Sequence, residues 1–190
     1  MESPDPTELA EAASDPFKTH CALFISALAL ILTVNNLGGS NTGKEATMSN
    51  ILASNMYSFY QAKNIRQTEY KLAADQIEMQ LSSEKLSPQA IEFLQGKLAG
   101  YKKNIDRYES DPETGEGKKE LMVKAKSLEQ ERDLALRKDP WFDYAEGLLQ
   151  LALVLTSVAI ISNRRPMFYA SAVLGVLGSV STLNGYFLFY

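Results

Sequence analysis

The chain has 190 residues, of which 45% are hydrophobic and 22% charged, and a formal net charge of −4. Outside the acidic N-terminal segment the acidic and basic side chains balance, so the sequence lacks the basic surface that nucleic-acid binding requires. One cysteine and one histidine exclude an intrachain disulfide and a cysteine-cluster metal site, and they leave few zinc arrangements.

Residues 1–16 form an acidic tail that is expected to be flexible, and an apolar run follows over residues 17–38. This run is long enough to cross a bilayer core as a helix. A cleaved signal peptide is the alternative, but the preceding segment is acidic and no small-residue cleavage site follows Val34. We therefore expect an uncleaved anchor. His20 and Cys21 are adjacent, so they point about 100° apart on a helix and are expected to be interfacial packing residues.

The middle of the chain, residues 39–140, is expected to be an extramembrane helical domain. The pattern predicts a helix from Lys44 to Ser83, then a turn in which Ser87 caps a second helix with Pro88 at its first position. The proline and glycines of residues 110–117 predict a loop, and a third helix is expected over 118–138. Leu121, Ala125, Leu128 and Ala135 share one face of that helix, which Arg132 interrupts.

The clearest periodicity lies in the second of these helices, where apolar residues are spaced alternately by three and four. Such a seam is typical of a helix that packs against another in an antiparallel coiled-coil-like hairpin. The seam residues are Ile91, Leu94, Leu98, Tyr101, Ile105 and Tyr108.

A second membrane helix is expected over residues 141–162, with Asp139 as its N-cap and Pro140 in its first turn. Asp143 and Glu146 near this end are expected to be solvated, and a cation site is the alternative. A short basic turn, 163–166, leads into a third membrane helix over 167–190. Small residues on the third helix permit close packing against the second helix or another subunit, and two amides are expected to bond between helices. These packing candidates are Ser171, Gly175, Gly178, Ser179, Gly185, Gln150 and Asn184.

The tight turn with Arg164 and Arg165 is expected to be cytoplasmic by the positive-inside rule. The N-terminus is then cytoplasmic as well, while residues 39–140 and the C-terminus lie on the periplasmic side.

Several segments together resemble one bacterial inner-membrane family, catalogued as domain of unknown function 4337. They are the string from Tyr60 to Arg66, the segment Asp15 to Phe17, the run 127–133 and the apolar run 148–154. The most specific residues are Tyr60, Gln61, Ala62, Lys63, Ile65 and Arg66. The resemblance implies three membrane spans and a helical insert, with no activity or cofactor attached. Relatives run helically from the membrane into the insert, so the segment Gly38 to Gly43 is interpreted as a departure and a hinge.

We found no catalytic constellation. Gly115, Gly117 and Lys118 lack the remaining elements of a phosphate loop, and the aromatic and basic residues around Tyr60 are expected to brace neighbouring helices. The expected function is that of a non-enzymatic accessory protein of the bacterial inner membrane, which self-associates or joins a larger membrane complex and uses no cofactor. The alternative is a subunit of an oligomeric channel or transporter, although the spans carry no charge near their centres.

Overall fold

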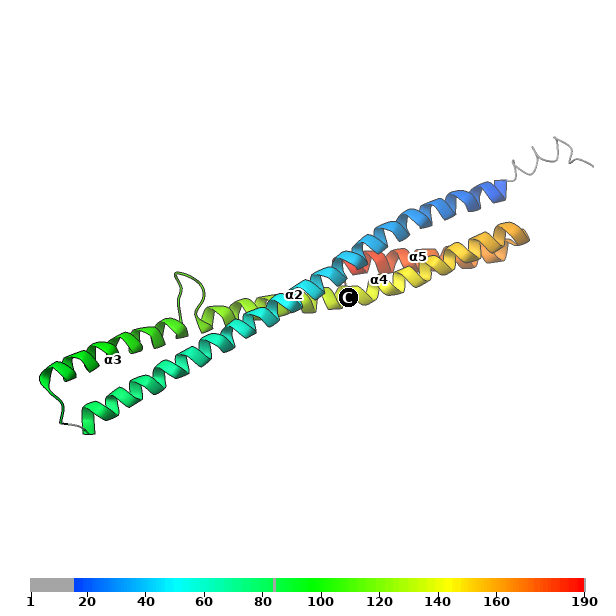
Figure 1. The fold of residues 1–190 in the computed structure, drawn as a ribbon. Coiled ribbons are helices and arrows are strands. Elements are labelled where there is room, and N and C mark those ends of the chain that lie inside the picture. Colours follow the sequence, from blue (N-terminus) through cyan, green and yellow to red (C-terminus); the bar gives the residue numbers. More distant parts are fainter. Residues whose placement is uncertain (1–15, 84, 190) are drawn as a thin grey trace, which may run out of the picture. The chain divides into compact units, whose positions relative to one another are not determined.

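The computed structural model describes residues 16–83 and 85–189, and these residues form four α-helices (Figure 1). The helices are α2 (Pro16–Ser83), α3 (Pro88–Glu109), α4 (Lys118–Ser162) and α5 (Arg165–Phe187). The described chain contains no strand, so the all-α prediction is confirmed. Of the predicted acidic tail, residues 1–15 lie outside the described residues.

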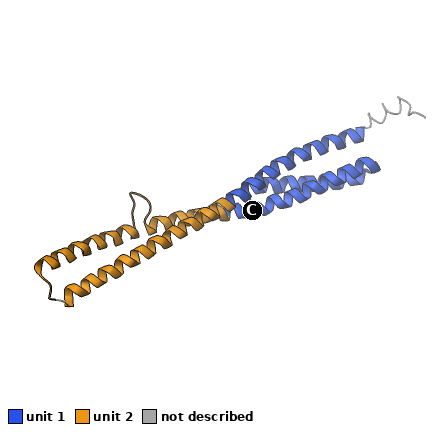
Figure 2. Cartoon of the chain, viewed as in Figure 1, with its two compact units in different colours: residues 1–46, 134–190 blue, residues 47–133 orange. Residues whose placement is uncertain are grey.

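The chain divides into two compact units (Figure 2). Unit 1 consists of residues 1–46 and 134–190, and unit 2 of residues 47–133. Three helices, α2, α4 and α5, each contain an apolar stretch long enough to span a membrane.

One face of α2 is shielded along the whole helix. Its positions are spaced alternately by four and three residues, and every one of them is buried or partly buried. Many are small or polar, for example Asn35, Thr42 and Ser49, so the spacing of apolar side chains alone does not reveal this register. The positions are Cys21, Ile25, Leu28, Leu32, Asn35, Gly39, Thr42, Ala46, Ser49, Ala53, Met56, Tyr60, Lys63, Gln67, Tyr70, Ala74, Ile77 and Leu81.

The predicted hinge at Gly38–Gly43 is wrong, because α2 continues through it without a break. Gly38 and Gly39 serve side-chain packing instead. A Cβ on Gly38 would lie 2.5 Å from the ring of Phe142 and 2.7 Å from the hydroxyl of Tyr186. A Cβ on Gly185 would lie 2.9 Å from the same ring. Glycine is therefore needed here to make room for Phe142, whose side chain is 2% exposed.

The predicted helix start at Asp139 and Pro140 is also wrong, since α4 runs from Lys118 to Ser162 with Pro140 inside it. Ala135, Phe142 and Ala145, on both sides of the proline, are buried, and this packing holds the segment helical despite the missing N–H donor. The basic turn is shorter than predicted: α5 begins at Arg165, and Arg164 is its N-cap residue.

Unit 1 is a three-helix packing with a small apolar core of Leu28, Leu149 and Ala152. Polar side chains join the helices around it. Asn35 donates to the carbonyl oxygen of Phe142 at 3.0 Å and accepts from the hydroxyl of Thr182 at 3.0 Å. The hydroxyls of Thr156 and Ser171 are 2.8 Å apart. These bonds connect α2 to α4, α2 to α5, and α4 to α5.

In unit 2, α2 lies antiparallel to α3, because Gln67 bonds to Glu109 whereas Glu78 pairs with Lys102 at 2.8 Å. The ring of Tyr70 contacts the rings of Tyr101 and Tyr108, at centroid distances of 5.4 and 5.8 Å. Of the rest of the predicted α3 seam, Leu94, Leu98 and Ile105 are partly buried, whereas Ile91, at 37%, is exposed. Ser87 is the N-cap of α3, as predicted.

We predict opposite effects of alanine at two glycines of unit 1. Gly38→Ala should lower the free energy of unfolding by about 1–3 kcal/mol, because Gly39 and Gly185 confine Phe142 and the ring cannot move aside. A Cβ on Gly147 would meet no described atom within 4 Å, so Gly147→Ala should be neutral or stabilise by up to about 1 kcal/mol. Unfolding of the full chain in detergent, followed by circular dichroism, measures both. A harmless Gly38→Ala would contradict the packing role.

Candidate functional site at the junction of three helices

The partner of α2 changes near Gln67, in unit 2. Before this point its shielded face contacts α4, where Lys118 lies 5.6 Å from the centre of the Tyr60 ring, and after it the face contacts α3 through Tyr70. The loop between Glu109 and Lys118 lies at the point where α4 and α3 replace one another as the partner of α2. Three helices and a loop thus meet at one polar cluster, which we call the junction.

Lys118 lies at the centre of the junction. It is the first residue of α4, and it is only 9% exposed. Its ammonium group donates to the side-chain oxygen of Gln67 at 2.8 Å and to that of Asn64 at 3.1 Å. It also pairs with the Glu109 carboxylate at 3.1 Å and lies 5.6 Å from the centre of the Tyr60 ring. A buried ammonium group is tolerated because its hydrogen-bonding capacity is used in this way.

Gln67 completes the cluster from α2. It is 2% exposed, and its amide nitrogen donates to the Ile105 carbonyl at 2.9 Å and to Glu109 at 3.1 Å. The hydrogen bond from Gln67, followed by that from Lys118, lowers the pKa of Glu109 below its usual value, although burial opposes the shift. Glu109 is therefore held in its charged form.

Glu120, in the first turn of α4, fastens the beginning of the loop. Its carboxylate accepts from the Ser110 hydroxyl at 2.6 Å and from the Asp111 backbone N–H at 3.2 Å. The Ser110 bond is the main cause of the lowered pKa of Glu120. Gly117 permits the close approach, since a Cβ there would lie within 2.6 Å of the Ser110 Cα. The hydrogen bond from Arg107 likewise lowers the pKa of Asp111.

Some residues of the motif from Tyr60 to Arg66 lie in the junction or line a cavity, and others point to the exterior. Tyr60, Lys63 and Asn64 take part in the junction; Lys63 pairs with Glu116 at 3.2 Å and lies 5.5 Å from the centre of the Tyr108 ring. Ala62 and Arg66 line a neighbouring cavity, whereas Gln61 and Ile65 point to the exterior. The expectation that these aromatic and basic residues brace helices therefore describes only part of the motif.

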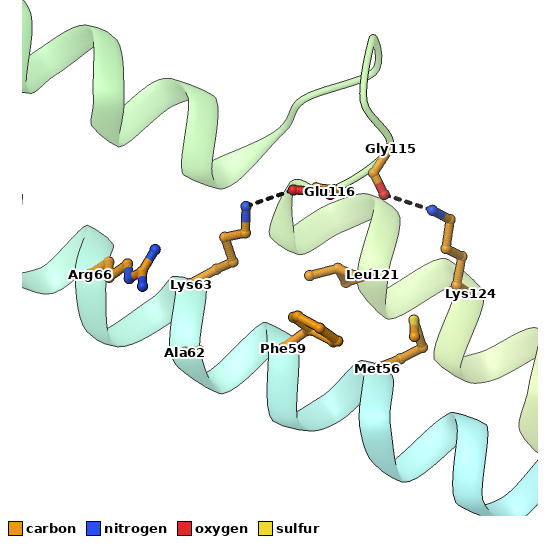
Figure 3. A pocket seen from close by; sticks show the side chains of 9 residues that line it. All are labelled: Met56, Phe59, Ala62, Lys63, Arg66, Gly115, Glu116, Leu121 and Lys124. Atoms are coloured by element: carbon orange, nitrogen blue, oxygen red, sulfur yellow. Dashed lines mark hydrogen bonds and ion pairs between the residues drawn. The ribbon is translucent and has the colours of Figure 1, made fainter.

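The cavity beside the junction has a volume of about 410 Å³ and lies between α2 and the start of α4 (Figure 3). Met56, Phe59 and Leu121 give it an apolar floor, and Lys63, Arg66 and Lys124 supply three cations. Lys63 and Lys124 reach the loop, where they bond to Glu116 and to the Gly115 carbonyl. No motif found in the sequence predicted this cavity, because its walls come from segments more than forty residues apart.

Within the described part of the chain no three His, Cys, Asp or Glu side chains could hold a metal ion together. Cys21 is buried, and the His20 ring bonds to the Pro16 carbonyl of its own helix. Asp139, Asp143 and Glu146 line a hollow with Asn35 and Asn36 in unit 1. The described residues of the junction hold the chain's own charged groups in place, and none of the contacts among them joins a nucleophile to a base.

The small residues of α5 pack inside the chain. Gly175 faces Leu28 of α2, Gly178 faces Leu149 of α4, and Ser171 bonds to Thr156. Ser179 is partly buried and bonds within α5. The expected interhelical bond of Gln150 is wrong, because Gln150 is exposed and donates to Glu146 of its own helix. The Asn184 side chain accepts from the backbone N–H of Phe189, just after α5. Asn35 makes the interhelical bonds instead.

Fold and site define an all-helical protein with three apolar helices, each long enough to cross a membrane, and a polar, charged helical unit. The chain belongs to the family described as domain of unknown function (DUF4337), whose model matches residues 17–188. No curated protein and no solved structure matched it.

Replacing Lys118 tests the junction. Lys118→Met should lower the free energy of unfolding by about 1–3 kcal/mol, because the buried Gln67 side chain would lose a charged hydrogen-bond partner and Glu109 would lose its ion-pair partner. Lys119→Met removes the same charge from an exposed neighbour and should change it by less than about 0.5 kcal/mol. Near-ultraviolet circular dichroism of the tyrosines follows unfolding of unit 2. Equal effects of the two variants would contradict a central role for Lys118.

The junction should also weaken in acid. A carboxyl group whose pKa is lower in the folded state stabilises the fold above its unfolded pKa, about 4.3 for Glu, and loses that effect as the pH falls through the folded value. Thermal unfolding of unit 2 should therefore occur at lower temperature at pH 3 than at pH 7. Glu109→Gln should reduce this difference, and Glu92→Gln, at an exposed site on α3, should not. An unchanged pH dependence in Glu109→Gln would refute the assignment.

Proposed function

We propose that this chain is a non-enzymatic accessory protein of the bacterial inner membrane, anchored by unit 1, which self-associates through the exposed face of α2 in unit 2. The observation that carries the proposal is a row of exposed side chains on α2, opposite its shielded face. We call it the outer stripe, and it consists of Met48, Ile51, Asn55, Ser58, Ala62, Ile65, Glu69, Leu72, Gln76 and Met79.

The surface of unit 1 supports a place in the bilayer. Large apolar side chains point outward from all three helices, including Leu30 at 70% exposure, Ile161 at 86% and Val176 at 62%. Several polar side chains are buried, among them Asn35, Thr156 and Thr182, and every described side-chain nitrogen or oxygen that is buried has a hydrogen-bond partner. A lipid environment favours this distribution, in which apolar side chains lie on the surface and hydrogen-bonded polar groups lie in the interior. A paired interior also favours an anchor over a conducting path.

The proposed topology places the N-terminus and the 163–166 turn in the cytoplasm, and unit 2 with the C-terminus in the periplasm. Arg164 and Arg165 support it, because both are exposed in a turn between two apolar helices.

The outer stripe has the geometry of a second helix-packing seam. Its positions alternate in steps of three and four, and Ile51, Ile65, Leu72 and Met79 are 50–68% exposed. From Met48 to Met79 it extends for about 47 Å of helix, more than four heptads. The apolar burial available to a dimer is therefore large.

A second copy of the chain is the occupant that fits this stripe. Two copies inserted the same way in a bilayer are parallel, so a two-fold axis brings each stripe residue against its own counterpart. Asn55 and Ser58 would then pair with themselves, and a polar residue in such a seam fixes the register at some cost in stability. Arg66 lies one turn before Glu69 and can offset the charge that the two glutamates bring together.

Charges in the outer stripe should separate the copies. Ile65→Glu combined with Leu72→Glu should raise the dissociation constant of the dimer by at least about a hundredfold, since apolar contacts are lost on both copies. Native mass spectrometry in detergent measures the oligomeric state. Val123→Glu is the matched control, because Val123 is 69% exposed on α4 and lies outside the stripe.

Crosslinking in membranes tests the register. In a Cys21→Ser background, Ser58→Cys should form a disulfide-linked dimer, whereas cysteine at Lys126, on the exposed side of α4, should not. A monomer under all conditions would overturn the proposal, and dimers that survive both stripe charges would place the interface elsewhere.

A further inference from the structure

We infer that the cavity beside the junction binds a small amphipathic anion, a phosphate or carboxylate group attached to a short aromatic or aliphatic body. The inference rests on the lining of the cavity and does not depend on self-association. Its volume, about 410 Å³, falls within the range typical of small-molecule sites.

The cationic side of the cavity has capacity to spare. Lys63 and Lys124 are each bonded to the loop, through Glu116 and the Gly115 carbonyl. Arg66 makes no hydrogen bond or ion pair with any described residue, and its guanidinium lies on the same side of the cavity as the Lys63 ammonium (Figure 3). A guanidinium can hold two oxygens of a phosphate or carboxylate at once.

The Glu116 carboxylate is the resident anion of this site. Its pairing with Lys63 is weakly held, because the Glu116 side chain is 66% exposed and water competes for both partners. An incoming phosphate or carboxylate can therefore replace it at Lys63 and bond to Arg66 at the same time. The charge of Lys63 stays compensated, because one anion replaces another beside it.

The apolar floor selects for a body attached to the charge. The Phe59 ring is 58% exposed and lies beside Leu121, with Met56 next to it (Figure 3). An aromatic or aliphatic group placed on this floor would remove the Phe59 ring from water. A free inorganic anion gains nothing from the floor, and an uncharged aromatic gains nothing from Arg66.

The test uses the full chain in phosphatidylcholine nanodiscs and phenyl phosphate as the probe, measured by isothermal titration calorimetry. We expect saturable binding, with a dissociation constant at least about tenfold lower than those of inorganic phosphate and benzyl alcohol. Absence of saturable binding, or equal binding of inorganic phosphate, would overturn the inference.

Variants assign the site. Arg66→Gln should weaken binding by about tenfold or more, since it removes a charge-assisted contact, and Glu116→Gln should strengthen it several-fold by removing the competing anion. Lys71→Gln is the matched control, an exposed cation on α2 outside the cavity, and should change binding less than about twofold. Unaltered binding in Arg66→Gln would overturn the assignment, while an unchanged circular dichroism spectrum excludes misfolding.

A further arm distinguishes the sources of the anion. Phosphatidylglycerol is added to the nanodiscs in increasing proportion. If phosphatidylglycerol weakens the binding of phenyl phosphate to the unaltered chain but not to Arg66→Gln, the result would support the site with a lipid headgroup as its ligand. Unchanged phenyl phosphate binding would support it with a soluble metabolite. Because Ile65→Glu with Leu72→Glu tests self-association separately, failure of one proposal leaves the other intact.

Discussion

Both units depend on one face of α2, whose positions alternate in steps of three and four from Cys21 to Leu81. A continuous register of this kind allows other helices to pack against α2 at successive points along its sequence. In unit 1 the partners are α4 and α5, and in unit 2 they are first α4 and then α3. The residue types along the face determine whether each contact is apolar packing, a hydrogen bond or an ion pair.

In unit 1 the face is small and polar where the helices are closest. Gly38 and Gly39 make room for Phe142, and Asn35 bonds to both neighbouring helices. Close packing and hydrogen bonds are what hold helices together in a lipid environment, where burial of apolar surface gives little gain. The apolar side chains accordingly cover the outside, which is the basis of the proposed anchoring role.

In unit 2 the same face carries Lys63 and Gln67, which are unusual seam residues. Their role follows from the exchange of partners at this point. Where α3 ends and α4 begins, the helix termini and the loop expose backbone groups and charges that an apolar seam would leave without partners. Lys118, Gln67 and Glu109 satisfy one another there. The same change of partner leaves a cavity under the loop. Cations line this cavity, and not all of them take part in the junction.

The amino-acid sequence by itself determined the all-α class, the three apolar stretches, the Ser87 cap and the loop before Lys118, because each follows from local composition or spacing. It misplaced the helix limits at Gly38 and Pro140, where glycine and proline normally interrupt a helix but tertiary contacts with Phe142 and Ala145 keep it continuous. Only the tertiary structure decided that the α5 glycines pack within the chain and that Asn35, rather than Gln150, bonds between helices. It alone brought Arg66, Lys124 and Leu121 to one cavity, since proximity across more than fifty residues of sequence depends on how helices pack and not on any local pattern.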